Sequence, residues 1–215
     1  MIDLHTHSLF SDGGLLPSEL IRRAEAAGYE AVAITDHGDS SNLDWIIPRI
    51  VKVCRDVKRY GKIQAVPGIE LTHLPPDLIL PLVQQARNLG AQIIVVHGET
   101  VVEPVSPGTN RKAIEAGVDI LAHPGLISKE EVSLAKEKNV FLEITSRKGH
   151  SLSNGHVARL ALQVGAPMVL NSDSHLPEDL LSKEAARKVA VGAGMTVADF
   201  GRMLENSRAL LSRCF

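Results

Sequence analysis

The sequence has few aromatic residues, few cysteines, no long apolar run and almost no net charge. Its 215 residues include four Phe, two Tyr and one Trp. The two cysteines, Cys54 and Cys214, are too few for a disulfide framework and predict a cytoplasmic protein. A net charge of −2 gives no basic surface, so we expect no stable nucleic-acid complex. No apolar run approaches the roughly 20 residues that span a bilayer. The first residues show no basic region followed by an apolar stretch, so we expect no signal peptide.

Apolar residues are plentiful, and their distribution predicts one domain. Hydrophobic residues make up 44% of the chain and charged residues 22%, which is typical of a globular protein. No Ser/Gly/Pro-rich linker or block of like charge divides the sequence. We therefore predict a single domain over residues 1–215, whose oligomeric state the sequence does not indicate.

Short apolar runs alternate with longer amphipathic stretches along the chain. The expected strands are Ile2–Leu4, Ala31–Ile34, Ile63–Val66, Gln92–Val96, Asp119–Ala122, Val140–Ile144 and Met168–Leu170. The expected helices are Pro17–Ala27, Leu43–Tyr60, Leu78–Leu89, Asn110–Ala116, Lys129–Lys138, His156–Val164, Glu178–Ala193 and Val197–Ser212. This alternation indicates an α/β fold with a parallel sheet. A barrel of βα units is favoured over an open doubly wound sheet, because no GxGxxG loop follows the first strand, but the pattern leaves both possible.

A His, Asp or Glu follows every expected strand except the sixth, which contains Glu143 within the strand itself. These residues are His5, His7, Asp12, Asp36, His37, Glu70, His97, Glu99, His123, Glu143, Asp173 and His175. In parallel α/β folds the carboxyl ends of the strands lie together and form the active site. Six of the nine histidines belong to this set, a sorting that scattered surface histidines would not show.

The types and spacing of these residues point to metal binding. His5 and His7 are two positions apart on an extended chain, so their side chains point the same way, and Asp173 and His175 repeat this spacing. Imidazole combined with carboxylate suits Zn, Mn or Fe. About nine ligands are too many for one tetrahedral zinc, which takes three or four. We therefore expect two or three divalent ions that share a bridging carboxylate.

Arg147 and Glu143 are the candidate catalytic residues. Arg147 follows the sixth strand and is expected to clamp a phosphate, because a guanidinium group matches phosphate geometry; a solvated turn is the alternative. Glu143 could contact the substrate or orient a ligand histidine. Glu99 could also orient a ligand histidine, or it could be a solvated charge in a loop. Three histidines match no strand end as well and are expected not to bind metal: His73, His150 and His156.

Six short motifs carry most of these residues. They are His5-Thr6-His7-Ser8 with Ser11-Asp12-Gly13, Thr35-Asp36-His37, Pro67-Gly68-Ile69-Glu70, His97-Gly98, His123-Pro124 and Asn171-Ser172-Asp173-Ser174-His175. Taken together, and over most of the chain, they resemble the PHP superfamily (polymerase and histidinol phosphatase). The resemblance implies a distorted (βα)7 TIM-like barrel with a site for two or three metals, which decides between the barrel and the open sheet.

The resemblance also implies how the ligands are shared among the metals. The ligands implied for the first metal are His5, His7, Glu70 and Asp173. Glu70 would bridge to a second metal, also held by His97 and His123. The ligands implied for the third are Asp12, His37 and His175. Asp12 stands where some members have His, so we expect the third site to be weaker or to prefer a harder metal.

The function implied by the resemblance is hydrolysis of phosphate esters. Expected substrates are small phosphate monoesters, such as histidinol phosphate or a nucleotide, attacked by a metal-activated hydroxide. The segment Glu103–Asn110 is a candidate lid over the site. Two alternatives remain, an amidohydrolase-type enzyme that cleaves C–N or C–O bonds and a non-catalytic metal-binding module.

Overall fold

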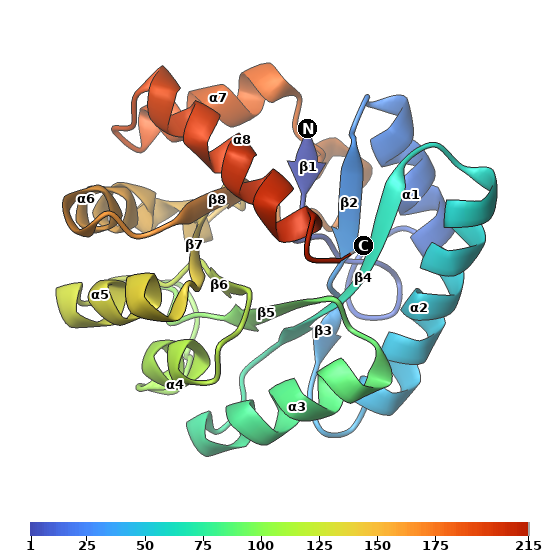
Figure 1. Ribbon diagram of the computed structural model, residues 1–215, viewed down its shortest axis with the longest axis horizontal. Helices are drawn as coiled ribbons and strands as arrows, with labels where there is room; N and C mark the ends of the chain where they lie inside the picture. The colour runs from blue at the N-terminus through green and yellow to red at the C-terminus, as the bar shows by residue number, and fades with distance from the viewer. Residues whose placement is uncertain (215) are drawn as a thin grey trace.

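The computed structural model describes residues 1–214. Eight parallel strands form the centre of this part of the chain. The strands are β1 (Ile2–Asp3), β2 (Ala31–Ile34), β3 (His37–Gly38), β4 (Gln64–Leu71), β5 (Ile93–His97), β6 (Ile120–Ala122), β7 (Phe141–Thr145) and β8 (Met168–Asn171). Seven of them neighbour one another in the order β1-β2-β4-β5-β6-β7-β8, and the short β3 pairs with β4. Figure 1 shows the strands at the centre with helices around them, so the predicted α/β barrel is confirmed.

The first and last strands close the barrel only just beyond their carboxyl ends. Thr6 forms an isolated parallel bridge with Ser174. The backbone N–H of His7 donates to the carbonyl of Ser174 at 2.8 Å, and the N–H of Asp173 donates to the carbonyl of His5 at 3.0 Å. The backbone bonds that close the barrel therefore also align the first and last of the predicted metal-binding motifs.

Eight α-helices surround the strands, and local sequence signals set many of their ends. They are α1 (Pro17–Ala26), α2 (Leu43–Tyr60), α3 (Ile79–Leu89), α4 (Thr109–Glu115), α5 (Lys129–Lys138), α6 (Asn154–Val164), α7 (Lys183–Gly192) and α8 (Val197–Leu211). Helices α3 and α6 end at Gly90 and Gly165, whose φ angles of 104° and 74° are left-handed. Ser128 and Glu131 form a capping box that starts α5, with mutual side-chain and backbone bonds.

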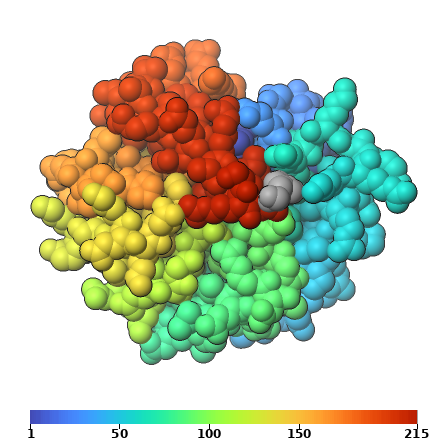
Figure 2. All heavy atoms as spheres, viewed as in Figure 1, coloured from blue at the N-terminus to red at the C-terminus, as the bar shows by residue number. Residues whose placement is uncertain are grey.

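Apolar side chains form two layers, one inside the barrel and one between strands and helices. The inner cluster includes Ile2, Leu4, Val95, Phe141 and Val169 from the strands. It is completed by Leu210, Leu211 and Cys214 from the C-terminal segment. Figure 2 shows this segment, in red, over the middle of the face toward the viewer. The end of α8 thus fills the amino end of the barrel and leaves the carboxyl end for the polar residues.

Strand β4 is longer than expected, because its Pro-Gly pair lies within the strand. The expected strand ended at Val66. Pro67 continues the pairing with β2, and a side-chain carbon on Gly68 would lie only 2.8 Å from the carbonyl oxygen of Ile93. Glycine allows this close approach, so the strand continues and Glu70 lies inside it rather than after it.

The seventh helix starts later than expected. A single helix was expected from Glu178, but a short 3-10 turn (Pro177–Asp179) is followed by extended chain at Leu180. Helix α7 begins only after Ser182, whose hydroxyl accepts from the backbone N–H of Ala185. No helix within residues 1–214 combines the length and apolar character needed to cross a bilayer.

We predict that the contact of α8 with the barrel interior is a main source of stability. Leu210 is fully buried in the inner cluster, so Leu210→Ala should lower the free energy of unfolding by about 2–5 kcal/mol. Urea denaturation followed by circular dichroism measures the change. The matched control is Leu162→Ala on α6, because Leu162 is 41% exposed and should change stability by no more than about 0.5 kcal/mol. Equal effects of the two substitutions would contradict the conclusion that the end of α8 stabilises the barrel by filling its amino end.

Candidate metal centre

All nine predicted ligands lie together at the carboxyl end of the barrel. His5 and His7 follow β1, His37 starts β3, His97 ends β5 and His123 follows β6. The carboxylates come from the β1–α1 loop, from β4 and from the segment after β8: Asp12, Glu70 and Asp173. His175 completes the set. Each of these histidines lies within 4.0 Å of a carboxylate and each carboxylate within 4.0 Å of a histidine, among them partners from distant parts of the chain.

The carboxylate of Glu70 lies at the centre of this cluster and is fully buried. Its Oε1 is 3.4 Å from Nε2 of His5 and 3.7 Å from Nε2 of His123. Its Oε2 is 2.7 Å from Nδ1 of His37 and 3.7 Å from Nε2 of His7. The two oxygens thus face different histidines, which is the arrangement that a bridging ligand between two cations needs.

Asp173 is the second buried carboxylate of the cluster. Its Oδ1 is 3.1 Å from Nε2 of His7 and 3.7 Å from Nε2 of His5, and its Oδ2 is 3.7 Å from Nε2 of His123. Burial raises the pKa of Asp173 to about 7. Asp173 and His123 have φ angles of 54° and 27°, which non-glycine residues rarely adopt and which often mark functional sites.

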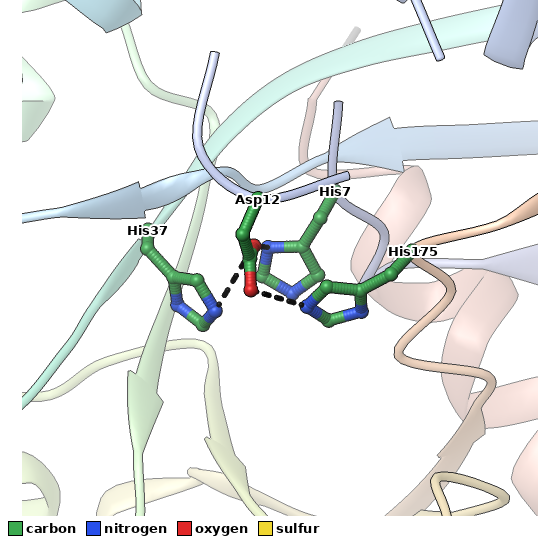
Figure 3. Close-up of side chains that lie close together, drawn as sticks. All are labelled: His7, Asp12, His37 and His175. Atoms are coloured by element: carbon green, nitrogen blue, oxygen red, sulfur yellow. Dashed lines mark ion pairs between the residues drawn. The ribbon is translucent and has the colours of Figure 1, made fainter. Parts of the chain in front are cut away.

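A third group of side chains surrounds Asp12 at the mouth of the site (Figure 3). The carboxylate oxygens of Asp12 lie 3.5 Å from Nε2 of His37, 3.2 Å from Nε2 of His175 and 4.0 Å from Nδ1 of His7. Unlike Glu70, the Asp12 side chain is 56% exposed. The loop that carries it is held by buried Asp36, whose carboxylate accepts from the backbone N–H and the hydroxyl of Ser8.

Glu143 lies behind the cluster and does not line the pocket, which favours orientation of a ligand histidine over substrate contact among its two candidate roles. The side chain is fully buried. Its Oε1 accepts from Nδ1 of His5 at 2.8 Å and from Nδ2 of Asn171 at 2.8 Å, and its Oε2 accepts from the backbone N–H of His123 at 3.2 Å. Glu143 therefore positions His5, whose Nε2 faces Glu70 and Asp173.

Burial and mutual contacts divide the histidines into two protonation classes. Burial lowers the pKa of His7 and of His123 well below the usual value, and neighbouring histidines lower it further. Burial also opposes protonation of His5, but nearby carboxylates outweigh it and raise the pKa of His5 well above the usual value. In the same way, Glu70 overcomes burial and raises the pKa of His37 to about 9. Burial opposes ionisation of Glu70, yet His5 and His37 hold its pKa well below the usual range.

Many buried polar atoms of the cluster lack a hydrogen-bond partner. Among the described residues, seven buried side-chain nitrogen and oxygen atoms have none: His5 Nε2, His7 Nδ1, His7 Nε2, Glu70 Oε1, His97 Nδ1, His123 Nδ1 and Ser172 Oγ. All but the last belong to predicted ligands. Unpartnered buried polar groups cost free energy, and bound cations would satisfy those that face the centre. Imidazole and carboxylate donors in this arrangement fit divalent Zn, Mn or Fe.

A pocket of about 330 Å³ opens above the cluster. Its walls are formed by Asp12, His37, Thr72, His73, His97, Glu103, Arg147, His150, Asp173 and His175. Arg147, a predicted phosphate ligand, therefore reaches the pocket, where its Nη1 lies 3.5 Å from Oδ2 of Asp179. Glu99 does not line it: Glu99 Oε1 accepts from the backbone N–H groups of Gly108 and Asn110 and so holds the start of α4.

Glu103 and His150 are pocket residues that the sequence did not identify. Glu103 was considered only as the start of a lid, and His150 was expected not to bind metal. The Glu103 carboxylate lies 3.0 Å from Nε2 of His73, 3.2 Å from Nε2 of His97 and 3.4 Å from Nε2 of His150. Glu103 lies in the loop after β5, and His150 begins the 3-10 turn after β7, so neither directly follows a strand. His156 lies elsewhere, 2.8 Å from the carbonyl oxygen of Ile127.

Comparison with known proteins identifies the family. Residues 3–145 match the model of the PHP domain. The chain belongs to the PHP family. It is 48% identical over 214 residues to an uncharacterized protein of Methanocaldococcus jannaschii, and the match covers 98% of each chain. It is 29% identical over 239 residues to a Shewanella frigidimarina protein named "Probable phosphatase", covering 99% of this chain and 92% of that protein.

The fold of this PHP protein also occurs in a larger assembly. A chain of archaeal ribonuclease P, solved with mature tRNA, matches it with a TM-score of 0.74. The match covers 99% of this chain and 90% of that chain at 17% identity. At this identity the similarity is one of fold, so it carries no conclusion about activity.

We predict that Glu143 supports metal binding through His5. The two carboxylate oxygens of Glu143 accept three hydrogen bonds, and Glu143→Gln replaces one of these oxygens with an amide donor, so the His5 ring should lose its fixed orientation. Metal affinity should fall roughly 10–100-fold. Isothermal titration with Zn²⁺ or Mn²⁺ measures it, with Glu115→Gln on the exposed face of α4 as the matched control. Unchanged affinity in Glu143→Gln would show that this hydrogen bond does not position a ligand.

Proposed function

We propose that this PHP protein is a metal-dependent phosphoesterase that hydrolyses small phosphate monoesters. The observation that carries the proposal is one arrangement: residues with buried, unpartnered imidazole and carboxylate atoms form a floor beneath Asp173 and His37, which line a pocket whose wall also presents Arg147. Cations on the floor and a guanidinium on the wall match the charge of a phosphoryl group. The relative named as a probable phosphatase supports the same class of reaction.

The ligands are assigned to the metals as the family resemblance implies. The first cation would be held by His5, His7, Glu70 and Asp173. The second would share Glu70 and be held by His97 and His123. The third would be held by Asp12, His37 and His175. Zn, Mn and Fe are the candidate ions, and Asp12 favours a harder ion than a histidine would.

Bound divalent ions would supply a water of lowered pKa as the nucleophile and neutralise charge on the phosphate. The residues of the chain then have distinct tasks. Glu70 remains ionised between the histidines, and Glu143 fixes His5 from behind. Arg147 binds and orients the phosphoryl oxygens from the wall. The pocket of about 330 Å³ is near the lower limit of ligand pockets, which favours small esters such as histidinol phosphate or a nucleotide.

We expect turnover of p-nitrophenyl phosphate by protein loaded with Zn²⁺ or Mn²⁺. His7→Ala and Asp173→Ala each remove a group at the floor of the pocket, so kcat/KM should fall by roughly two to three orders of magnitude. His156→Ala, outside the pocket, is the matched control and should keep wild-type activity.

A wider substrate panel separates this proposal from its alternatives. Hydrolysis of amides or lactones in preference to phosphate esters would favour an amidohydrolase-type enzyme. Stoichiometric metal without turnover of any phosphorylated metabolite, nucleotide or short oligonucleotide would favour a non-catalytic module. Full activity in the His7→Ala/Asp173→Ala double variant would reject the site assignment itself.

Arg147 is predicted to act on phosphate binding. Removing a charge-assisted hydrogen bond costs about 1.5–3 kcal/mol, so Arg147→Ala should lower kcat/KM roughly 10–100-fold. Inorganic phosphate is a product of the proposed reaction and is expected to bind the same wall, so its inhibition constant should rise in parallel. Arg111→Ala, on the exposed face of α4 and paired with Glu115, is the control and should change neither value. A loss of activity in Arg147→Ala with an unchanged inhibition constant for inorganic phosphate would contradict the role of Arg147 in binding phosphate.

A further inference from the structure

His150 lies beside two of the proposed ligands although the family pattern does not include it. Its ring is buried and stacks on that of His123, with ring centroids 4.1 Å apart and an interplanar angle of 15°. The centroid of His97 lies 5.7 Å away. One candidate ligand atom from each of these three histidines lies within 4.8 Å of the others. Three buried imidazoles therefore lie within reach of one small volume, and the His123 and His150 rings must turn out of their stacked arrangement for both to direct a lone pair to the same cation.

A hydrogen bond through one ring nitrogen fixes the orientation of His150. Its Nδ1 lies 2.7 Å from the hydroxyl of Thr100, which is buried. If Nδ1–H donates to this hydroxyl, Nε2 keeps its lone pair and remains available to a cation. Metal-binding histidines are commonly held in this way, with one nitrogen bonded to a fixed partner and the other facing the metal.

Packing between two loops holds both partners of this hydrogen bond in place. The 3-10 turn that begins at His150 follows Gly149, whose φ of 89° is left-handed. A side-chain carbon at Gly149 would lie 3.4 Å from Val102, so the loop after β5 packs against the loop after β7. The loop after β5 also carries Thr100 and Glu103.

Two carboxylates reach the three histidines from different sides. Glu70 lies 3.7 Å from Nε2 of His123, and Glu103 lies 3.2 Å from Nε2 of His97 and 3.4 Å from Nε2 of His150. A cation among the three imidazoles would thus have carboxylate oxygens on either side. Three nitrogen ligands with one oxygen are typical of Zn²⁺ and Co²⁺, whereas Mg²⁺ prefers oxygen ligands.

We propose that His97, His123 and His150 form a tris-histidine site for a zinc-type cation, closed toward solvent by Glu103. The proposal rests on the proposed function, because His97 and His123 belong to the same metal centre. It adds His150 as a ligand of the second cation and Thr100 as the residue that positions it. The other interpretation is that His150 only ties two loops together through Thr100.

The test measures metal binding directly, without an activity assay. Full-length protein is stripped with a chelator and titrated with Zn²⁺ in competition with a chromophoric chelator, and Co²⁺ absorption reports the coordination geometry. We compare wild type with His150→Ala, with His150→Asn, whose amide retains a partner for Thr100, and with Thr100→Val. His156→Ala is the matched control, because this histidine of α6 bonds the carbonyl of Ile127 outside the pocket.

Wild type and His156→Ala should have the same Zn²⁺ stoichiometry, affinities and Co²⁺ spectrum. Both His150 variants should weaken one Zn²⁺ equivalent at least tenfold and alter the Co²⁺ bands, and Thr100→Val should weaken the same equivalent roughly 10–100-fold. If His150→Ala does not fold, His150→Asn and Thr100→Val carry the test.

Two results would overturn the inference, and they are distinguishable. Wild-type affinity and an unchanged Co²⁺ spectrum in the folded His150 variants would reject His150 as a ligand while leaving the metal centre intact. Failure of the wild-type protein to bind Zn²⁺ or Co²⁺ would instead reject the proposed metal centre, and His150 with it.

Discussion

The contact between the Glu70 carboxylate and the imidazoles around it links the fold to its chemistry. Glu70 is fully buried in β4, and its two oxygens face histidines that follow β1 and β6 or begin β3. A buried carboxylate is stable only with charge or hydrogen-bond partners, so these histidines must stay near it. The same requirement fixes the positions of the strand ends that carry these histidines. The proposed metal ligands therefore lie close together around a small volume.

Closure of the barrel supports this cluster with backbone bonds. The bonds between the segments after β1 and after β8 join the parts of the chain that carry His5, His7 and Asp173. Behind them, Glu143 and Asn171 connect β7, β8 and His5 through side-chain bonds. The amino end of the barrel is filled separately by Leu210, Leu211 and Cys214. Stability is therefore concentrated at one end of the barrel and chemistry at the other, as in other barrels of this architecture.

The outer part of the site is built differently from its floor. The floor residues lie on or next to strands, whereas Glu103, Arg147 and His150 lie on longer loops that pack on one another. Loops of this kind vary more readily than strands, and they set substrate choice on a shared scaffold. In this chain the outer loops bring Glu103 next to three histidines, His73, His97 and His150.

The pattern of residues in the sequence determined the order of strands and helices and the candidate His, Asp and Glu residues at the carboxyl ends of the strands, and the family resemblance added the barrel and the choice of nine ligands. These are local signals: apolar runs mark buried strands, glycine ends helices, and His5, His97 and His123 lie at or next to the ends of strands. Only the tertiary structure decided that Pro67 and Gly68 continue a strand, that Glu143 faces away from the pocket, and that Glu103 and His150 face into it. Those outcomes depend on close approach between distant segments, as between Gly68 and Ile93 or Gly149 and Val102. Periodicity and spacing report on neighbours along the chain, so contacts between loops are set by packing that they do not encode.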